Sequence, residues 1–155
     1  VMEGTKQVIF KLGEEEYGFD IMLVNAIETY TGVVPVPNAP ENILGILNLR
    51  GEVIPVFSLR AKFGLSEQAS AESQLIVTRT KNMLVGFQVD SVREIVEIQG
   101  KQISEVPVIV KSEKTAYAKA VANINGRMVI LLDHEGILNA VEQHSITTLV
   151  EKQLA

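Results

Sequence analysis

Residues 43–59 have the sequence ILGILNLRGEVIPVFSL, two apolar runs separated by one polar pair that begins with glycine. The pair Gly51-Glu52 suits a two-residue hairpin turn, because glycine adopts the positive φ that such a turn needs at its first position. Pro55 lacks a backbone donor, so the second strand is expected to be an edge strand or to be bulged there. The stretch therefore predicts a β-hairpin.

Side chains near this turn are candidates for a binding surface. Successive side chains of a strand point to opposite faces, so Leu47 and Leu49 would face the core while Asn48 and Arg50 project outward together. The planar guanidinium of Arg50 suits carboxylate or carbonyl groups of a partner protein. The alternative is that Arg50 is an ordinary surface arginine in a hairpin.

The second half of the chain repeats motifs of the first half in the same order. The matched segments are 16–21 with 83–89, 24–27 with 92–95, and 48–55 with 123–130. We interpret this as an internal duplication, with approximate repeats at 7–65 and 74–140. About five short strands per repeat cannot bury both faces of an open sheet, so each repeat is expected to form a small β-barrel packed against its twin. Strand exchange between the two subdomains is left open.

Short connector helices complete this mainly β fold. Asp20 can cap a helical turn over 21–24, and a second turn is expected over 60–63. Three prolines hold 33–40 extended. The C-terminal helical expectations are a turn starting at Asp133 or His134 and an amphipathic helix over 146–154.

Composition excludes several classes of function. The chain has 155 residues, 46% hydrophobic and 21% charged, which suits one compact domain with an aliphatic core rather than stacked rings. The net charge of -5 with scattered basic residues argues against nucleic-acid binding. The absence of cysteine excludes disulfides, and no apolar run is long enough to span a bilayer. These features predict a cytoplasmic protein.

Catalytic and metal-binding patterns are absent from the sequence. Asp133-His134 superficially resembles a base beside its orienting acid, but adjacent strand residues point apart, so a corner with Asp133 as helix cap is favoured. Consecutive acids at 14–16 alternate sides and cannot converge on one ion. We therefore predict no catalytic residue, no metal site and no cofactor.

Two duplicated apolar pairs suggest a second binding surface. Val24 and Ile27 in the first half correspond to Val92 and Ile95 in the second. If the barrels are related by approximate twofold symmetry, these segments can meet near the axis and line a groove for a partner helix. The alternative is that all four are plain core residues.

The stretch PVPNAP at 35–40, followed by 43–60, resembles the signature of the CheW family of chemotaxis coupling proteins. The similarity continues at 16–21, 85–92 and 126–133, so it covers nearly the whole chain. It implies two SH3-like barrels and a non-catalytic adaptor. Its implied partners are the cytoplasmic tip of methyl-accepting chemotaxis receptors and the regulatory domain of the histidine kinase CheA.

The resemblance also implies site residues. The receptor-facing candidates are Val24, Gly45, Asn48 and Arg50, with Ile27, Val92 and Ile95 completing the groove. Contacts to the kinase are not assigned. The family often has an acidic residue where this chain has Ser58, which puts a pairing of that position with Arg60 in doubt.

The resemblance further implies a cytoplasmic protein recruited to membrane receptor arrays. The alternative function is a CheW-like regulatory module of a larger signalling protein, either a CheA regulatory domain or a CheV-type adaptor.

Overall fold

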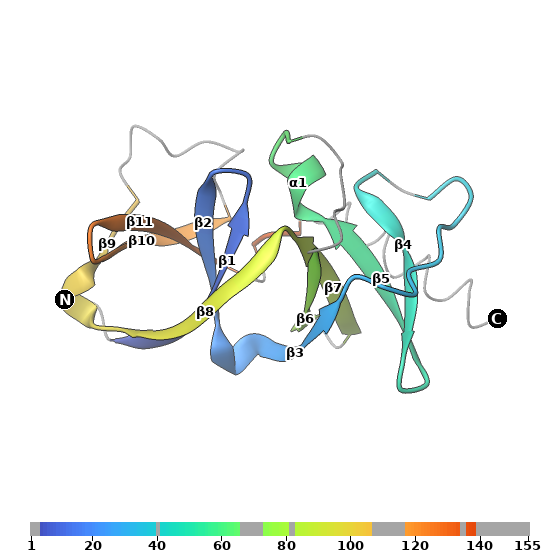
Figure 1. The fold of residues 1–155 in the computed structure, drawn as a ribbon, viewed down its shortest axis with the longest axis horizontal. Coiled ribbons are helices and arrows are strands. Elements are labelled where there is room, and N and C mark those ends of the chain that lie inside the picture. Colours follow the sequence, from blue (N-terminus) through green and yellow to red (C-terminus); the bar gives the residue numbers. More distant parts are fainter. Residues whose placement is uncertain are drawn as a thin grey trace.

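The computed structural model describes residues 4–39, 41–65, 73–80, 83–106, 117–133 and 136–138, and these residues form two curved β-sheets with short connecting helices (Figure 1). The elements in chain order are β1 (Thr5–Leu12), β2 (Glu15–Asp20), the 3-10 helix η1 (Ile21–Leu23), β3 (Val24–Thr29), β4 (Ile43–Leu49), β5 (Glu52–Ser58), α1 (Leu59–Lys62), β6 (Gln74–Thr80), β7 (Met83–Val89), β8 (Ser91–Ile98), the 3-10 helix η2 (Gly100–Gln102), β9 (Ile103–Ser104), β10 (Ala118–Ile124) and β11 (Arg127–Leu132). The mainly β prediction is confirmed.

Each sheet combines strands from both halves of the chain. One sheet has six strands in the order β8-β1-β2-β11-β10-β9, and the other has five in the order β3-β6-β7-β5-β4. The hairpin β1–β2 thus joins the later strands, while the hairpin β6–β7 joins the earlier ones. Each sheet contains one parallel pair, β2 with β11 and β7 with β5. The repeat boundaries at 7–65 and 74–140 stay a prediction.

Both sheets curl around their own apolar interior. Ala26 of β3 and Leu49 of β4 pack in one cluster, although their strands lie at opposite ends of the five-stranded sheet. In the six-stranded sheet Ile98 of β8 and Ile103 of β9, again from the two end strands, share a cluster with Ile9. Shared clusters between end strands indicate barrel-like curvature, although no ladder within the described residues joins the end strands directly.

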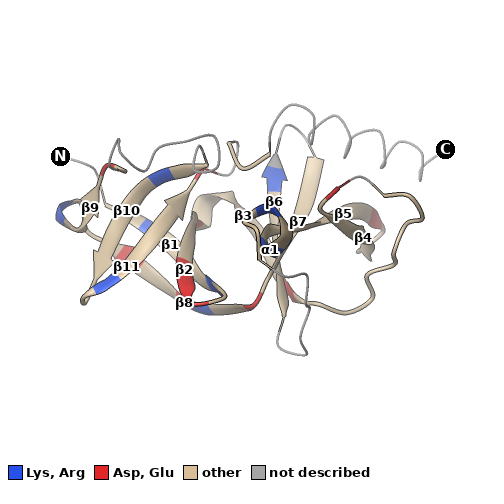
Figure 2. Ribbon diagram, turned by 90° about the horizontal axis from the view of Figure 1, so that it is seen from above, with Lys and Arg blue, Asp and Glu red and all other residues tan. Residues whose placement is uncertain are grey.

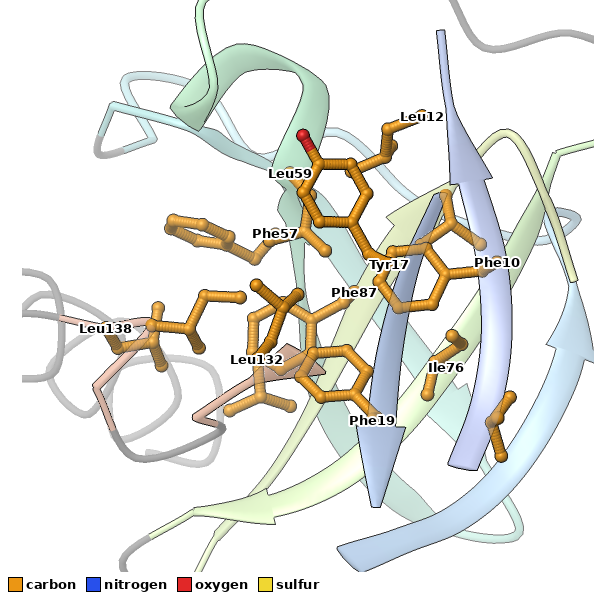
Figure 3. Close-up of a cluster of buried hydrophobic side chains, with 14 residues drawn as sticks. Phe10, Leu12, Tyr17, Phe19, Phe57, Leu59, Ile76, Phe87, Leu132 and Leu138 are labelled. Carbon is orange, nitrogen blue, oxygen red and sulfur yellow. The ribbon is translucent and has the colours of Figure 1, made fainter. Parts of the chain in front are cut away.

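A third cluster, which we call the central core, lies between the sheets (Figure 3). Phe19 of β2 contacts Phe87 of β7 with ring centroids 5.7 Å apart, and Phe57 of β5 meets the same ring at 5.9 Å. Phe10, Phe19, Phe57 and Phe87 are all fully buried. The expectation of an aliphatic core without ring contacts is therefore wrong for the central core, because the few phenylalanines of the chain gather where the two sheets meet.

A partly buried ion pair between Arg60 and Asp90 links helix α1, the β1–β2 turn and the β7–β8 connection. Arg60 of α1 donates from one of its terminal nitrogens to Asp90 Oδ2 at 2.6 Å, and the backbone N–H of Gly13 donates to the same oxygen at 2.8 Å. Ser58 accepts from the N–H of Ala61 at 3.1 Å and so caps α1. The doubt about Ser58 is resolved in this way: Arg60 pairs with Asp90, between β7 and β8.

Asp20 caps η1 as predicted, through the N–H of Met22 at 2.9 Å. The strand β5 that holds Pro55 is not an edge strand, but its ladder with β7 begins only at Val56, so the missing donor interrupts no bond of that ladder. The expected helix over 146–154 and His134 lie outside the described residues.

Charged residues are interspersed over both sheets (Figure 2). Lysines, arginines and acidic residues are scattered in ones and twos, and no basic stripe follows any element in the described segments. Among the helices of these segments, none has the length and apolar character that a membrane crossing needs.

Burial of Tyr17 in the central core predicts a loss of stability at alkaline pH. Desolvation first, then the charges of Tyr117 and Glu15, raises the pKa of Tyr17 to about 12 from its ordinary value of 10.0. The folded state holds this proton more tightly, so the contribution is complete below pH 10 and is lost as the pH rises through 12, by on the order of 2 kcal/mol. Denaturant unfolding at pH 7 and pH 11 should show a smaller loss for Tyr17→Phe than for the unchanged chain; equal losses would contradict the assignment.

Candidate functional site

The β4–β5 hairpin ends in a tight turn centred on Arg50 and Gly51. Their φ values are 53° and 87°, and the flanking residues Leu49 and Glu52 form the last pair of the ladder. Positive φ at both central residues marks a type I′ turn. The predicted turn at Gly51-Glu52 is therefore displaced by one residue, because an arginine occupies a left-handed position that glycine or asparagine usually takes.

Asn48 stabilises this turn with its side chain. Its Oδ1 accepts a hydrogen bond from the N–H of Gly51 at 3.0 Å. Both Asn48 and Arg50 are exposed, as expected, but Arg50 stands in the turn rather than on the strand. Asn48 thus has a structural role in addition to any contact with a partner.

The guanidinium of Arg50 is held only weakly within the chain. It lies 3.9 Å from a carboxylate oxygen of Glu28 on β3, and its side chain is 80% exposed. An exposed pair at this distance contributes on the order of 0.5 kcal/mol. Arg50 can therefore turn to a carboxylate or carbonyl of a partner at little cost. The sequence did not predict the contact of Arg50 with Glu28, because no sequence pattern shows that β3 approaches the β4–β5 hairpin.

The β10–β11 hairpin reproduces the same turn without the arginine. Asn123 Oδ1 accepts from the N–H of Gly126 at 2.9 Å, and the central residues Asn125 and Gly126 have φ values of 52° and 87°. Asn-Gly is the preferred pair for a type I′ turn. The comparison shows that the fold of the hairpin does not require arginine at position 50.

Gly45 acts inside the protein rather than on its surface. It is buried in β4, and a Cβ atom there would lie 2.8 Å from the carbonyl carbon of Val34 and 3.1 Å from Pro35 Cα. Val34 pairs with Ile46 through two backbone hydrogen bonds of 2.8 and 2.9 Å. The absence of a side chain at Gly45 lets the proline-rich connector lie directly against β4.

The apolar pair of β3 shares one face because of a β-bulge. The extra residue is Asn25, and it shifts the pairing of β3 with β6. Val24 and Ile27 consequently stand opposite Thr78 and Ile76, which lie two residues apart on one face of β6. Without the bulge, residues three apart on a strand would face opposite sides.

The corresponding apolar pair of β8 also shares one face because of a β-bulge. Here the extra residue is Arg93, and Val92 and Ile95 stand opposite Phe10 and Val8 on one face of β1. These two partners belong to the central core. Val92 accordingly packs on the central core, and the bulge places Ile95 on the same face of β8.

The four apolar residues of β3 and β8 differ in how much of their side chains is exposed to solvent. Val24, Ile27 and Val92 are half-buried and pack on the central core, whereas Ile95 is 49% exposed. These residues belong to β3 and β8, which are end strands of the two different sheets, so both strands border the junction where the sheets meet. The arrangement offers an apolar surface along the junction, with Ile95 as its most accessible member.

No group of three or more His, Asp or Glu side chains within the described segments could hold a metal ion. Asp133 accepts a backbone bond from the N–H of Ile137 at 3.0 Å, as at the start of a turn, and His134 lies outside these segments.

The chain matches a known protein family over most of its length. The profile of the CheW-like domain matches residues 6–142. The chain belongs to the CheW family. It is 30% identical to the chemotaxis protein CheW of Rhizobium meliloti, with 92% of each chain covered. With the chemotaxis protein CheW of Klebsiella aerogenes it shares 35% identity over 90% of this chain and 84% of the relative.

A solved structure of the family shows the same fold. The crystal structure of the scaffolding protein TtCheW from Thermoanaerobacter tengcongensis superposes with a TM-score of 0.80 at 32% identity, covering 88% of this chain and 93% of that one. The chain is accordingly a chemotaxis scaffolding protein of a non-catalytic family, as the sequence predicted.

Proposed function

We propose that this CheW-family scaffold couples the cytoplasmic tip of methyl-accepting chemotaxis receptors to the regulatory domain of the histidine kinase CheA. The observation that carries the proposal is the family match over residues 6–142 together with relatives named for chemotaxis. The protein would work in the cytoplasm and be recruited to membrane receptor arrays. Individual contacts need only modest affinity there, because an array raises the effective concentration of each partner.

The receptor is proposed to bind along the junction of the two sheets. Val24, Ile27, Val92 and Ile95 would receive one apolar face of a receptor helix. Arg50 and Asn48 would fix its register through polar contacts, and Gly45 would contribute by positioning the connector. The bulges at Asn25 and Arg93 support this proposal, because both copies of the motif turn their apolar residues to one face. A separate surface would recruit the kinase.

A CheW-like module of a larger signalling protein would present the same surfaces. CheA itself and CheV-type adaptors are the two cases to consider. Sequencing the gene on both sides of residues 1–155 distinguishes them from a separate adaptor.

The groove is tested with a pair of exposed apolar residues. Ile95 is 49% exposed on β8, and Met128 is 71% exposed on β11 in the same sheet, away from the β3–β8 junction. Ile95→Lys should weaken binding to a purified receptor-tip fragment by about tenfold, ~1.4 kcal/mol, because a charge enters the apolar contact. Met128→Lys should leave that affinity within about twofold.

Titration calorimetry of the unchanged chain and both variants gives the result, with circular dichroism as the check on folding. Equal affinities for Ile95→Lys and the unchanged chain would rule out the groove. Failure of the unchanged chain to bind either the receptor fragment or the CheA regulatory domain would rule out the coupling function.

A further inference from the structure

The turn between β10 and β11 contains Asn125 followed by Gly126, and an asparagine–glycine pair occurs only once in the chain. Glycine has no side chain to hinder the approach of its backbone nitrogen to the amide of the preceding asparagine. Both residues are exposed, and nothing lies within 4 Å of the space that a Cβ of Gly126 would occupy. Water and base can therefore reach this turn. The matching turn of the first hairpin has Arg50 in place of the asparagine and so has no amide to react.

The chemistry open to this pair is deamidation through a cyclic imide. The backbone nitrogen of Gly126 loses its proton to base and forms a bond with Cγ of Asn125. The bond from Cγ to Nδ2 breaks, and the side-chain nitrogen leaves as ammonia. Water then opens the succinimide ring at one of its two carbonyl carbons, which gives aspartate or isoaspartate. Overall one water is consumed and one ammonia is released.

The side chain of Asn123 restrains the attacking nitrogen. Its Oδ1 accepts the N–H of Gly126 at 2.9 Å, so the proton that must leave is held in a hydrogen bond. Ile124 and Arg127 form the last pair of the ladder on either side of the turn. This pairing limits the backbone rotation that ring closure needs. The reaction therefore requires local opening of the turn.

We propose that Asn125 is a site of spontaneous deamidation and that the side chain of Asn123 sets its rate. Asn123 is followed by Ile124, whose branched side chain hinders the same attack. The reaction in this hairpin is thus confined to Asn125. Neither asparagine is among the candidate receptor-facing or groove residues, so the inference does not depend on the coupling function.

Isoaspartate at position 125 changes the backbone of the turn as well as its charge. It adds a methylene to the main chain, which a two-residue turn cannot accommodate while Ile124 stays paired with Arg127. The guanidinium of Arg127 contacts Glu16 of β2 and Glu94 of β8, each at 2.7 Å. Distortion of the turn therefore loosens ion pairs that connect three strands of the six-stranded sheet.

The test is incubation of the full chain in mildly alkaline buffer. Peptide mass spectrometry follows the exchange of amide for carboxylate at Asn125, and chromatography separates aspartyl from isoaspartyl peptides. The folded chain should react roughly tenfold more slowly than the same chain unfolded in guanidinium chloride. Asn123→Ala should raise the rate in the folded chain by about fivefold, the equivalent of one neutral hydrogen bond.

The matched control is Asn48→Ala, which removes the corresponding bond of 3.0 Å to Gly51 in the first hairpin. It should leave the rate at Asn125 unchanged, which separates a local effect from a general loss of stability. The isolated isoaspartyl chain should melt at a lower temperature than the unreacted chain, and an unchanged melting temperature would contradict the loosening of the Arg127 contacts. Equal rates for Asn123→Ala and Asn48→Ala would overturn the role of Asn123. A folded chain that keeps Asn125 intact while the unfolded chain reacts to completion would overturn the site.

Discussion

Arg50→Asn is expected to weaken binding of the receptor tip by about 30-fold, ~2 kcal/mol, without any loss of fold stability. The affinity falls because an exposed guanidinium that is free to meet a partner carboxylate is removed. Stability should hold or rise by up to about 1 kcal/mol, since asparagine tolerates the left-handed conformation at this position better than arginine. The loss of the 3.9 Å contact with Glu28 has little weight against this gain.

The second hairpin offers a reciprocal control. Asn125→Arg places arginine in a turn of the same geometry, with φ of 52° against 53° at Arg50. It should lower the free energy of unfolding by about 1 kcal/mol and leave receptor affinity unchanged. Urea unfolding and receptor titration on both variants decide the matter. If Arg50→Asn binds the receptor as well as the unchanged chain, Arg50 is an ordinary surface residue.

The β4–β5 hairpin was predictable from local sequence. Glycine at position 51 and the alternation around it are local signals, and the matching motif at Asn123 identified a hairpin of the same geometry. The turn was displaced by one residue because Arg50 has a conformation that its side chain disfavours. Such an exception to local preference cannot be seen in one sequence.

Features that depend on distant pairing were not predictable. The bulges at Asn25 and Arg93 exist only relative to the partner strands β6 and β1, so no periodicity within their own strands shows them. The central core contains ring contacts because Phe19 and Phe87 come from strands of different sheets. Similarly, the partner of Arg60 is Asp90, thirty residues further along the chain.

Gly45 has a structural reason to be glycine, separate from the receptor contact that the family resemblance implies. The resemblance places it among the receptor-facing residues, and its role in receptor binding stays a prediction. The structure adds a reason for glycine that needs no receptor, since Val34 and Pro35 occupy the space of a side chain. A backbone neighbour cannot move aside as the end of a flexible side chain can.

Gly45→Ala is accordingly expected to lower the free energy of unfolding by about 3 kcal/mol. The new methyl group must displace the connector, which breaks the two backbone bonds between Val34 and Ile46. Gly86→Ala is the matched control, because Gly86 is also buried in a strand of the five-stranded sheet but has its nearest neighbours at 3.8 Å. That variant should lose no more than about 1 kcal/mol.

Urea unfolding of the two variants tests the close approach, and hydrogen exchange at the amides of Val34 and Ile46 locates the damage. Faster exchange at both amides in Gly45→Ala alone is the expected result, because these N–H groups bond only across the contact that the methyl group disrupts. If Gly45→Ala is as stable as Gly86→Ala and protects both amides, the connector does not depend on glycine. The residue would then have to be explained by the partner that it contacts.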